Sequence, residues 1–78
     1  MSLALLPVKQ LERKLAQRLY QLREACGYSL PEVQAATGVQ VGRFEAGQAS
    51  LTVVTLVVLC QHYGVSEAEF FAGITGRP

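Results

Sequence analysis

Signals for the start and the end of a helix recur along almost the whole chain, and they constrain its fold more than any other feature. A proline at a first helical position and a serine or threonine before an apolar run are typical of helix N-termini, and a glycine after the run is typical of C-termini. The start signals are Pro7, Ser29, Thr52 and Ser66, and the stop signals are Gly27, Gly38, Gly47 and Gly64. The chain is therefore divided into segments that each have the length of a short helix.

The first segment carries one continuous apolar stripe. Its apolar residues are spaced three or four apart, as one face of a helix requires. They are Val8, Leu11, Leu15, Leu19, Leu22 and Cys26. The spacing predicts an amphipathic helix that ends at Gly27.

The second and third segments are shorter. Ser29 and Glu32 form a capping box, in which each side chain bonds to the backbone N–H of the other residue, and they predict a helix over residues 30–37. Val41 and Phe44 lie three residues apart, so they occupy one face of a helical turn. This spacing predicts a third, very short helix.

Residues 53–60 are nearly all apolar, and two structures compete for them. Their β-branched side chains favour a strand. Thr52 as an N-cap and Gly64 as a stop signal favour a helix, in which five apolar side chains share one face. Those five are Val53, Leu56, Val57, Cys60 and Tyr63. The flanking signals decide the matter, and we predict a helix.

The fifth segment repeats the capping box of the second. Ser66 and Glu69 have the required spacing, and they predict a short helix that runs to about Ala72. Phe70 and Phe71 are its apolar side chains, so we expect this helix to pack against the core through them.

Length and composition predict one domain. The chain has 78 residues, of which 50% are hydrophobic and 17% are charged. That is enough apolar material for a core, but a second core would need roughly 50 further residues. We therefore expect an all-α, compact five-helix bundle over residues 8–73, between an apolar N-terminal arm, residues 1–7, and a C-terminal tail, residues 74–78.

Charge and cysteine content argue against several function classes. The net charge of +1 creates no overall basic field that would indicate nucleic acid or an anionic membrane. Cys26 and Cys60 lack the spacing of a zinc or redox site, and we expect them to be buried as small apolar side chains rather than joined in a disulfide. No stretch is apolar enough to predict a membrane span, and the cytoplasm is the expected compartment.

No pattern in the sequence indicates an enzyme. There is no glycine-rich phosphate loop and no pair of carboxylates placed to converge on a cleft. His62 has no Ser, Cys, Asp or Glu at a spacing that would complete a triad or a metal site. We expect no catalytic activity, cofactor or metal, and interpret His62 as a surface residue.

Four stretches carry a family resemblance. They read LREACG at residues 22–27, GYSLPEVQAATGV at 27–39, FEAG at 44–47 and YGVS at 63–66. In this order and spacing, over roughly residues 11–72, the chain resembles the Cro/Xre-like helix-turn-helix domains of phage repressors, which have the lambda-repressor-like fold.

The resemblance implies roles for five residues. In this family the third helix enters the major groove of DNA, and side chains near its N-terminus contact bases. Gln40 and Arg43 hold such positions, and Gln48 holds a loop position that meets phosphate, although both residue types are also common on ordinary surfaces. Arg23 and Glu45 match a pair that joins the first helix to the third, which is a structural role.

Two features depart from the family pattern. The segment over residues 38–45 is about three residues shorter than usual, which removes roughly one helical turn before the recognition helix. Leu30 stands where many members carry a DNA-contacting glutamine, and Arg43 is the only basic residue between Leu30 and Gly76. Because phosphate neutralisation supplies most non-specific DNA affinity, so few cations predict weak binding in the usual geometry.

An apolar patch is predicted on the fourth helix. Val54 and Val58 face away from its expected core side, near His62, at positions where the family usually carries charged residues. Exposed patches of this kind often mark interfaces. We expect the patch to be covered either by a second copy of the chain or by the arm at residues 3–6.

Two functions are compatible with these features. The first is a small, dimeric helix-turn-helix regulator of transcription that binds double-stranded DNA. The alternative is a degenerate helix-turn-helix domain that has lost base readout and binds another protein through its fourth helix. The salt dependence of DNA binding distinguishes them, because phosphate contacts weaken steeply as the salt concentration rises.

Overall fold

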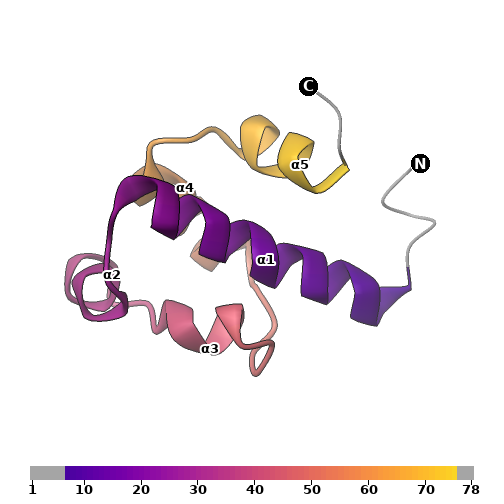
Figure 1. The fold of residues 1–78 in the computed structure, drawn as a ribbon, viewed down its shortest axis with the longest axis horizontal. Coiled ribbons are helices and arrows are strands. Elements are labelled where there is room, and N and C mark those ends of the chain that lie inside the picture. The colour runs from indigo at the N-terminus through magenta and orange to yellow at the C-terminus, as the bar shows by residue number, and fades with distance from the viewer. Residues whose placement is uncertain (1–6, 76–78) are drawn as a thin grey trace.

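The computed structural model describes residues 7–75, which form five helices and no strand. In chain order the helices are α1 (Val8–Cys26), α2 (Leu30–Thr37), α3 (Val41–Glu45), α4 (Val53–Tyr63) and α5 (Glu67–Thr75) (Figure 1). The all-α prediction is confirmed, and the apolar segment that competed between strand and helix is helical.

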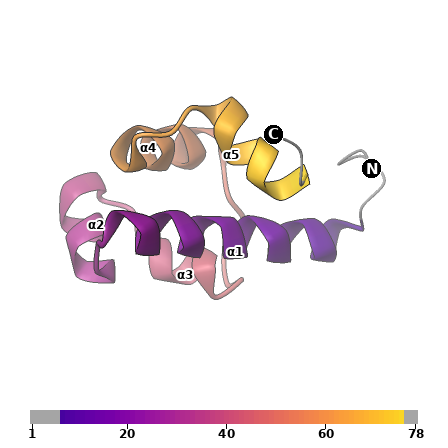
Figure 2. The ribbon, with the colours of Figure 1, turned by 45° about the horizontal axis from the view of Figure 1, so that its top comes forward.

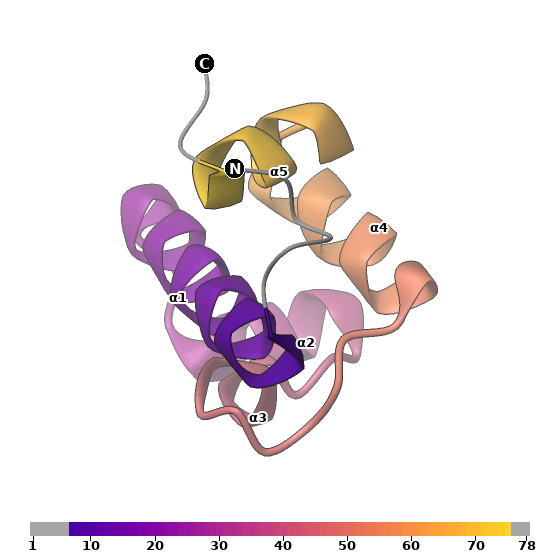
Figure 3. The same ribbon diagram turned by 90° about the vertical axis from the view of Figure 1, so that its right-hand side faces the viewer.

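The long helix α1 organises the other four. In Figure 2, α4 and α5 lie on one side of α1, α3 lies on the other, and α2 follows its C-terminal end. The view along α1 in Figure 3 shows the same arrangement, and α1 contacts α3, α4 and α5 directly. The molecule measures 35 × 26 × 20 Å.

Local capping explains where the helices begin and end. Ser29 Oγ accepts a hydrogen bond from the Glu32 backbone N–H at 3.2 Å, and Glu32 Oε1 accepts one from the Ser29 N–H at 2.8 Å. Ser66 and Glu69 form the same reciprocal pair, with both distances 3.0 Å. Gly27 ends α1 with φ of +75°, a conformation that favours glycine.

All five helices contribute to one apolar core. The fully or nearly fully buried side chains are Leu19, Leu22, Val33, Val41, Leu56, Leu59, Cys60, Tyr63, Phe70 and Ile74. Ile74 corrects the sequence prediction, because α5 continues to Thr75 and the expected tail begins within a helix. Ile74 lies one turn after Phe70, so it extends the same buried face. Of the expected N-terminal arm, residues 1–6 lie outside the described part of the chain.

The orientation of α4 differs from the predicted one. Val53 was expected on the core side, but its side chain is 77% exposed, whereas Leu59 is completely buried. Val54 is exposed as expected, while Val58 is only half-buried rather than fully outward. The first turn of α4 therefore lies beyond the neighbouring helices, and the core begins at Leu56.

Two further expectations about single residues are wrong. Cys26 is exposed and not buried, although Cys60 is buried as expected, and both are free thiols. His62 is half-buried rather than on the open surface, because its ring stacks on Tyr28 with 4.7 Å between the ring centroids.

Candidate nucleic-acid interface

The turn between α2 and α3 fixes how these two helices cross. Val33 in α2 and Val41 in α3 are 0% and 1% exposed, so each is held in the core. Between them, Thr37 Oγ1 donates to the Val33 carbonyl at 2.7 Å and accepts from the Val39 N–H at 3.1 Å. Gly38 turns the chain with φ of +76°. Together these contacts build a helix-turn-helix unit.

A bidentate ion pair between Arg23 and Glu45 attaches this unit to α1. Arg23 Nε donates to Glu45 Oε2 at 2.8 Å, and Arg23 Nη2 donates to Glu45 Oε1 at 3.0 Å. The side chains are only 10% and 9% exposed, and the hydrogen bonds that Arg23 donates to Glu45 raise the pKa of Arg23 above its ordinary value. Arg23 Nη1 also donates to the Tyr28 carbonyl at 2.9 Å. Arg23 thus holds both the end of α3 and the loop before α2.

The side chains with expected DNA roles lie on the outside of this unit. Gln40 directly precedes α3, Arg43 lies within it, and Gln48 follows in the loop; all three are exposed. α3 has only five residues, so it offers little more than one turn for contacts. Leu30 packs on Gly42, with its Cδ1 at 3.4 Å from where a Cβ would stand, and remains 41% exposed. An apolar side chain therefore occupies the start of α2.

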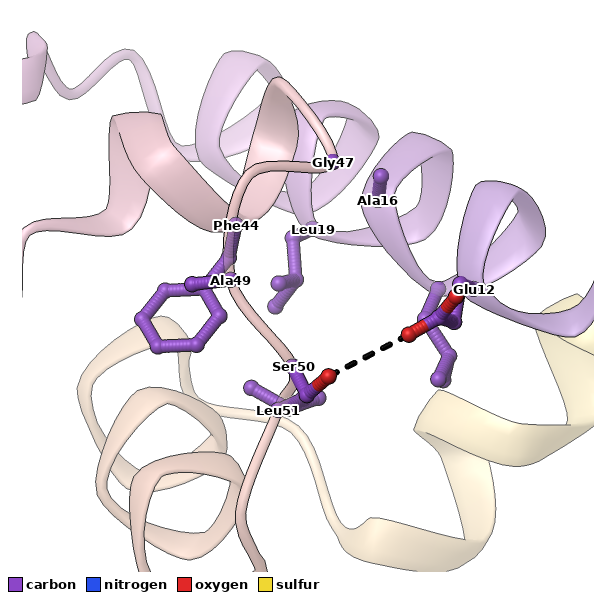
Figure 4. Close-up of a pocket in the computed structure, with 9 residues that line it drawn as sticks. Glu12, Ala16, Leu19, Phe44, Gly47, Ala49, Ser50 and Leu51 are labelled. Atoms are coloured by element: carbon purple, nitrogen blue, oxygen red, sulfur yellow. Dashed lines mark hydrogen bonds between the residues drawn. The ribbon is translucent and has the colours of Figure 1, made fainter. Parts of the chain in front are cut away.

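The loop after α3, which carries Gln48, is hydrogen-bonded to α1. Ser50 Oγ donates to Glu12 Oε2 at 3.2 Å, as Figure 4 shows. Together with these two residues, apolar side chains including Leu19, Phe44 and Leu51 line a cavity of about 20 Å³. The loop that carries Gln48 is thus anchored rather than open on its inner side.

The basic residues of α1 divide into three groups. Arg23 is paired with Glu45, and Arg18 donates to backbone carbonyls of α5. Lys9 and Arg13 are exposed and line one hollow together with the turn that ends α3, and Glu12 and Glu45 line the same hollow. The exposed side chain of Lys14 lies instead toward α5.

The contact between Arg18 and α5 is structural, and the sequence does not predict it. The periodicity of α1 places Arg18 on its solvated face. No local sequence pattern relates this residue to α5. The only sequence signal is Gly73, whose missing side chain makes room for it.

The fold and the attached α2–α3 unit define a small helix-turn-helix protein. A family model described as a helix-turn-helix domain matches residues 14–70, and the chain belongs to this family. The match confirms the resemblance inferred from the sequence. No curated protein and no solved structure shows a significant match.

No group of three or more His, Cys, Asp and Glu side chains within residues 7–75 is placed to hold a metal ion. None of the five helices combines the length and the apolar character that a membrane crossing requires.

Proposed function

We propose that this chain is a transcriptional regulator that binds double-stranded DNA as a homodimer. The observation that carries the proposal is the α2–α3 unit, which the Arg23–Glu45 pair holds rigidly on α1. A rigid scaffold that presents exposed polar side chains is what base and phosphate contacts require. In this proposal Gln40 and Arg43 contact bases and Gln48 contacts phosphate.

The cations of α1 support the same proposal. Arg43 alone would neutralise few phosphates, but Lys9 and Arg13 lie beside the end of α3 and extend the charged surface. DNA affinity should still be modest, since only three cations contribute and each phosphate contact is lost as salt competes.

The experiment is a fluorescence-anisotropy titration of a labelled duplex over a range of salt concentrations. We expect binding that weakens steeply with salt, and Arg43→Ala should remove about 1–3 kcal/mol of binding free energy. Lys14→Ala is the matched control, because it removes the same charge on the side of α1 that faces α5. Absence of binding at low salt, or equal losses in both variants, would overturn the proposal.

Dimerisation is proposed through the first turn of α4. Val53 and Val54 are 77% and 74% exposed, so two adjacent aliphatic side chains face water. α4 carries no Asp, Glu, Lys or Arg that would oppose contact with an identical helix. The interface is centred on these two residues, while Val58 and His62 are half-buried and contribute at its edge.

A second function is favoured by Leu30. An exposed leucine at the start of α2 gains nothing from phosphate, yet it suits an apolar partner. A protein-binding role of the helix-turn-helix unit is therefore the alternative, and Leu30 adds a second candidate surface to the one on α4 that the sequence predicts.

A further inference from the structure

We propose that a groove between α1 and α3 binds a short amphipathic helix of a partner protein that carries an acidic residue near one end. This groove does not include Gln40, Arg43 or Gln48, although its extension shares Lys9 and Arg13 with the proposed DNA-binding surface. The inference therefore goes beyond DNA binding, and each can fail without the other.

The groove has an apolar floor. It is an open hollow of about 620 Å³, and its walls come from α1, from the start of α2 and from α3. Tyr20 and Leu30 are 48% and 41% exposed, which makes them two of the largest apolar side chains that the described residues leave in contact with water. Gly42 and Ala46 keep the α3 wall low. A phosphate backbone would leave these side chains unpartnered, whereas apolar side chains of a protein would bury them.

The length of the groove fits a helix. Arg13, Ala16, Glu45 and Ala46 also line a second hollow of about 360 Å³, which extends the groove to Lys9. From Lys9 to Gln21, α1 rises about 18 Å, which is the length of about three helical turns. An open trough of this length is suited to a helix that presents apolar side chains at intervals of three and four residues.

The charges along the groove select the partner. Lys9 and Arg13 stand at one end, and the carboxylate of Glu45 is already bound by Arg23. Glu12 lies at the same end, where it accepts the hydrogen bond from Ser50. The Arg23–Glu45 pair is neutral as a whole, so Lys9, Arg13 and Glu12 leave one net positive charge at this end, and a carboxylate on the partner is favoured there.

The opposite end has a different character. Tyr20 Oη donates to Glu24 Oε1 at 3.3 Å, which places a carboxylate next to the apolar floor. Arg23 lies 3.7 Å from this carboxylate, but its guanidinium already binds both oxygens of Glu45. An acidic residue of the partner is disfavoured at this end and favoured at the other. The groove therefore accepts the partner helix in one direction.

The test uses a phage-displayed library of helical peptides that is panned against the full chain. The peptides have randomised residues on one face and at both ends. We expect enriched peptides to carry apolar residues at positions i, i+4 and i+7, and Asp or Glu at one end only. In a labelled full chain, their binding should shift the amide signals of Tyr20, Leu30 and Ala46.

Two variants place the peptide in the groove. Tyr20→Ala removes an exposed side chain, and Ala46→Gln inserts a longer one into the α3 wall. Each should weaken peptide binding by about tenfold or more. Lys14→Ala and Arg43→Ala, which lie outside the groove, should leave peptide affinity unchanged. Circular dichroism and thermal melting confirm that each variant is folded.

Several outcomes would overturn the inference. The first is that panning enriches no peptide. The second is that Tyr20→Ala and Ala46→Gln both leave the affinity of an enriched peptide unchanged. The third is that a peptide binds equally well with and without its acidic residue. If Tyr20→Ala dissociates an oligomer of the chain itself, the groove is occupied by a second copy instead. Loss of DNA binding in Arg43→Ala with unchanged peptide affinity separates this inference from the proposed function.

Discussion

The guanidinium group of Arg18 lies against α5 at Gly73, where a Cβ would collide with its Nε and Cζ atoms. From this position Arg18 Nε donates to the Phe70 carbonyl at 3.2 Å, and Nη2 donates to the Glu69 carbonyl at 3.1 Å. The arginine thus joins the middle of α1 to α5, and the glycine is what permits the approach.

Gly73→Ala should change stability in opposite directions in two backgrounds. In the wild type the new Cβ displaces Arg18, and losing two hydrogen bonds of about 1 kcal/mol each outweighs a gain of about 0.5–1 kcal/mol in helix propensity. In an Arg18→Ala background only the gain remains, so the same change should stabilise the protein. Denaturant unfolding of the four proteins measures both effects. Equal effects in the two backgrounds would show that Arg18 does not bind at Gly73.

Glu45→Ala should be among the most destabilising single substitutions. It leaves the guanidinium of Arg23 buried without its carboxylate, which costs about 3–5 kcal/mol for a buried pair. Glu24→Ala is the control, because Glu24 lies 3.7 Å from Arg23 but its side chain is 56% exposed. An exposed pair contributes about 1 kcal/mol or less. Similar unfolding midpoints for the two variants would contradict the structural role of Glu45.

The helix boundaries could be predicted from the sequence because their causes are local. The capping box of Ser29 and Glu32 needs only residues three apart, and the glycine that ends each helix acts on its own backbone. Gln40 and Arg43 could be placed on the outer surface for a related reason, since their neighbours Val41 and Phe44 identify the inner face, whereas only the family resemblance places Gln48 there.

The features that the sequence predicts wrongly or not at all depend on contacts between distant segments. α4 has nearly the same apolar character around its first two turns, so the sequence could not orient it, and Val53 was assigned to the wrong side. The contact of Arg18 with α5 spans more than 50 residues and leaves no periodic trace. The groove beside Tyr20 and Leu30 likewise exists only once α1 and α3 are packed together.

Stability should fall at acid pH in part through the two capping boxes. Hydrogen bonds from the backbone of Ser29 and Ser66 lower the pKa of Glu32 and Glu69 below the ordinary value of 4.5. A carboxylate with a lowered pKa in the folded state contributes its full stabilisation above pH 4.5 and loses it as the pH falls below that value. Unfolding measured from neutral to acid pH should show this loss.

A double glutamine variant separates the contribution of the two capping carboxylates from the rest of the loss of stability at acid pH. Glu32→Gln with Glu69→Gln keeps side-chain acceptors for both caps but removes their titration. Its stability should fall less between pH 4.5 and lower pH than that of the wild type. Parallel curves would show that the capping carboxylates are not linked to folding.

The two thiols should differ sharply in reactivity. Cys26 is exposed, whereas Cys60 is buried and desolvation raises the pKa of its thiol, so little thiolate forms there. A thiol reagent should therefore modify one cysteine quickly in the native protein and the second only on unfolding. Cys26→Ser should remove the fast phase and Cys60→Ser should leave it. Fast modification of Cys60 in the native state would contradict its burial.

The chain should be a homodimer at micromolar concentration, and the first turn of α4 should hold it together. Burying Val53 and Val54 contributes about 1.5–3 kcal/mol for each side chain, and a twofold axis counts the patch twice, less the ordering costs of association. Replacing both valines by Glu should make the protein monomeric without unfolding it, because acidic residues in a first helical turn are favourable. Gln61→Glu, at an exposed position of the same helix, is the charge-matched control and should remain dimeric. Sedimentation that shows the wild type as a monomer at about 100 μM, a concentration far above a micromolar dissociation constant, would contradict the dimer.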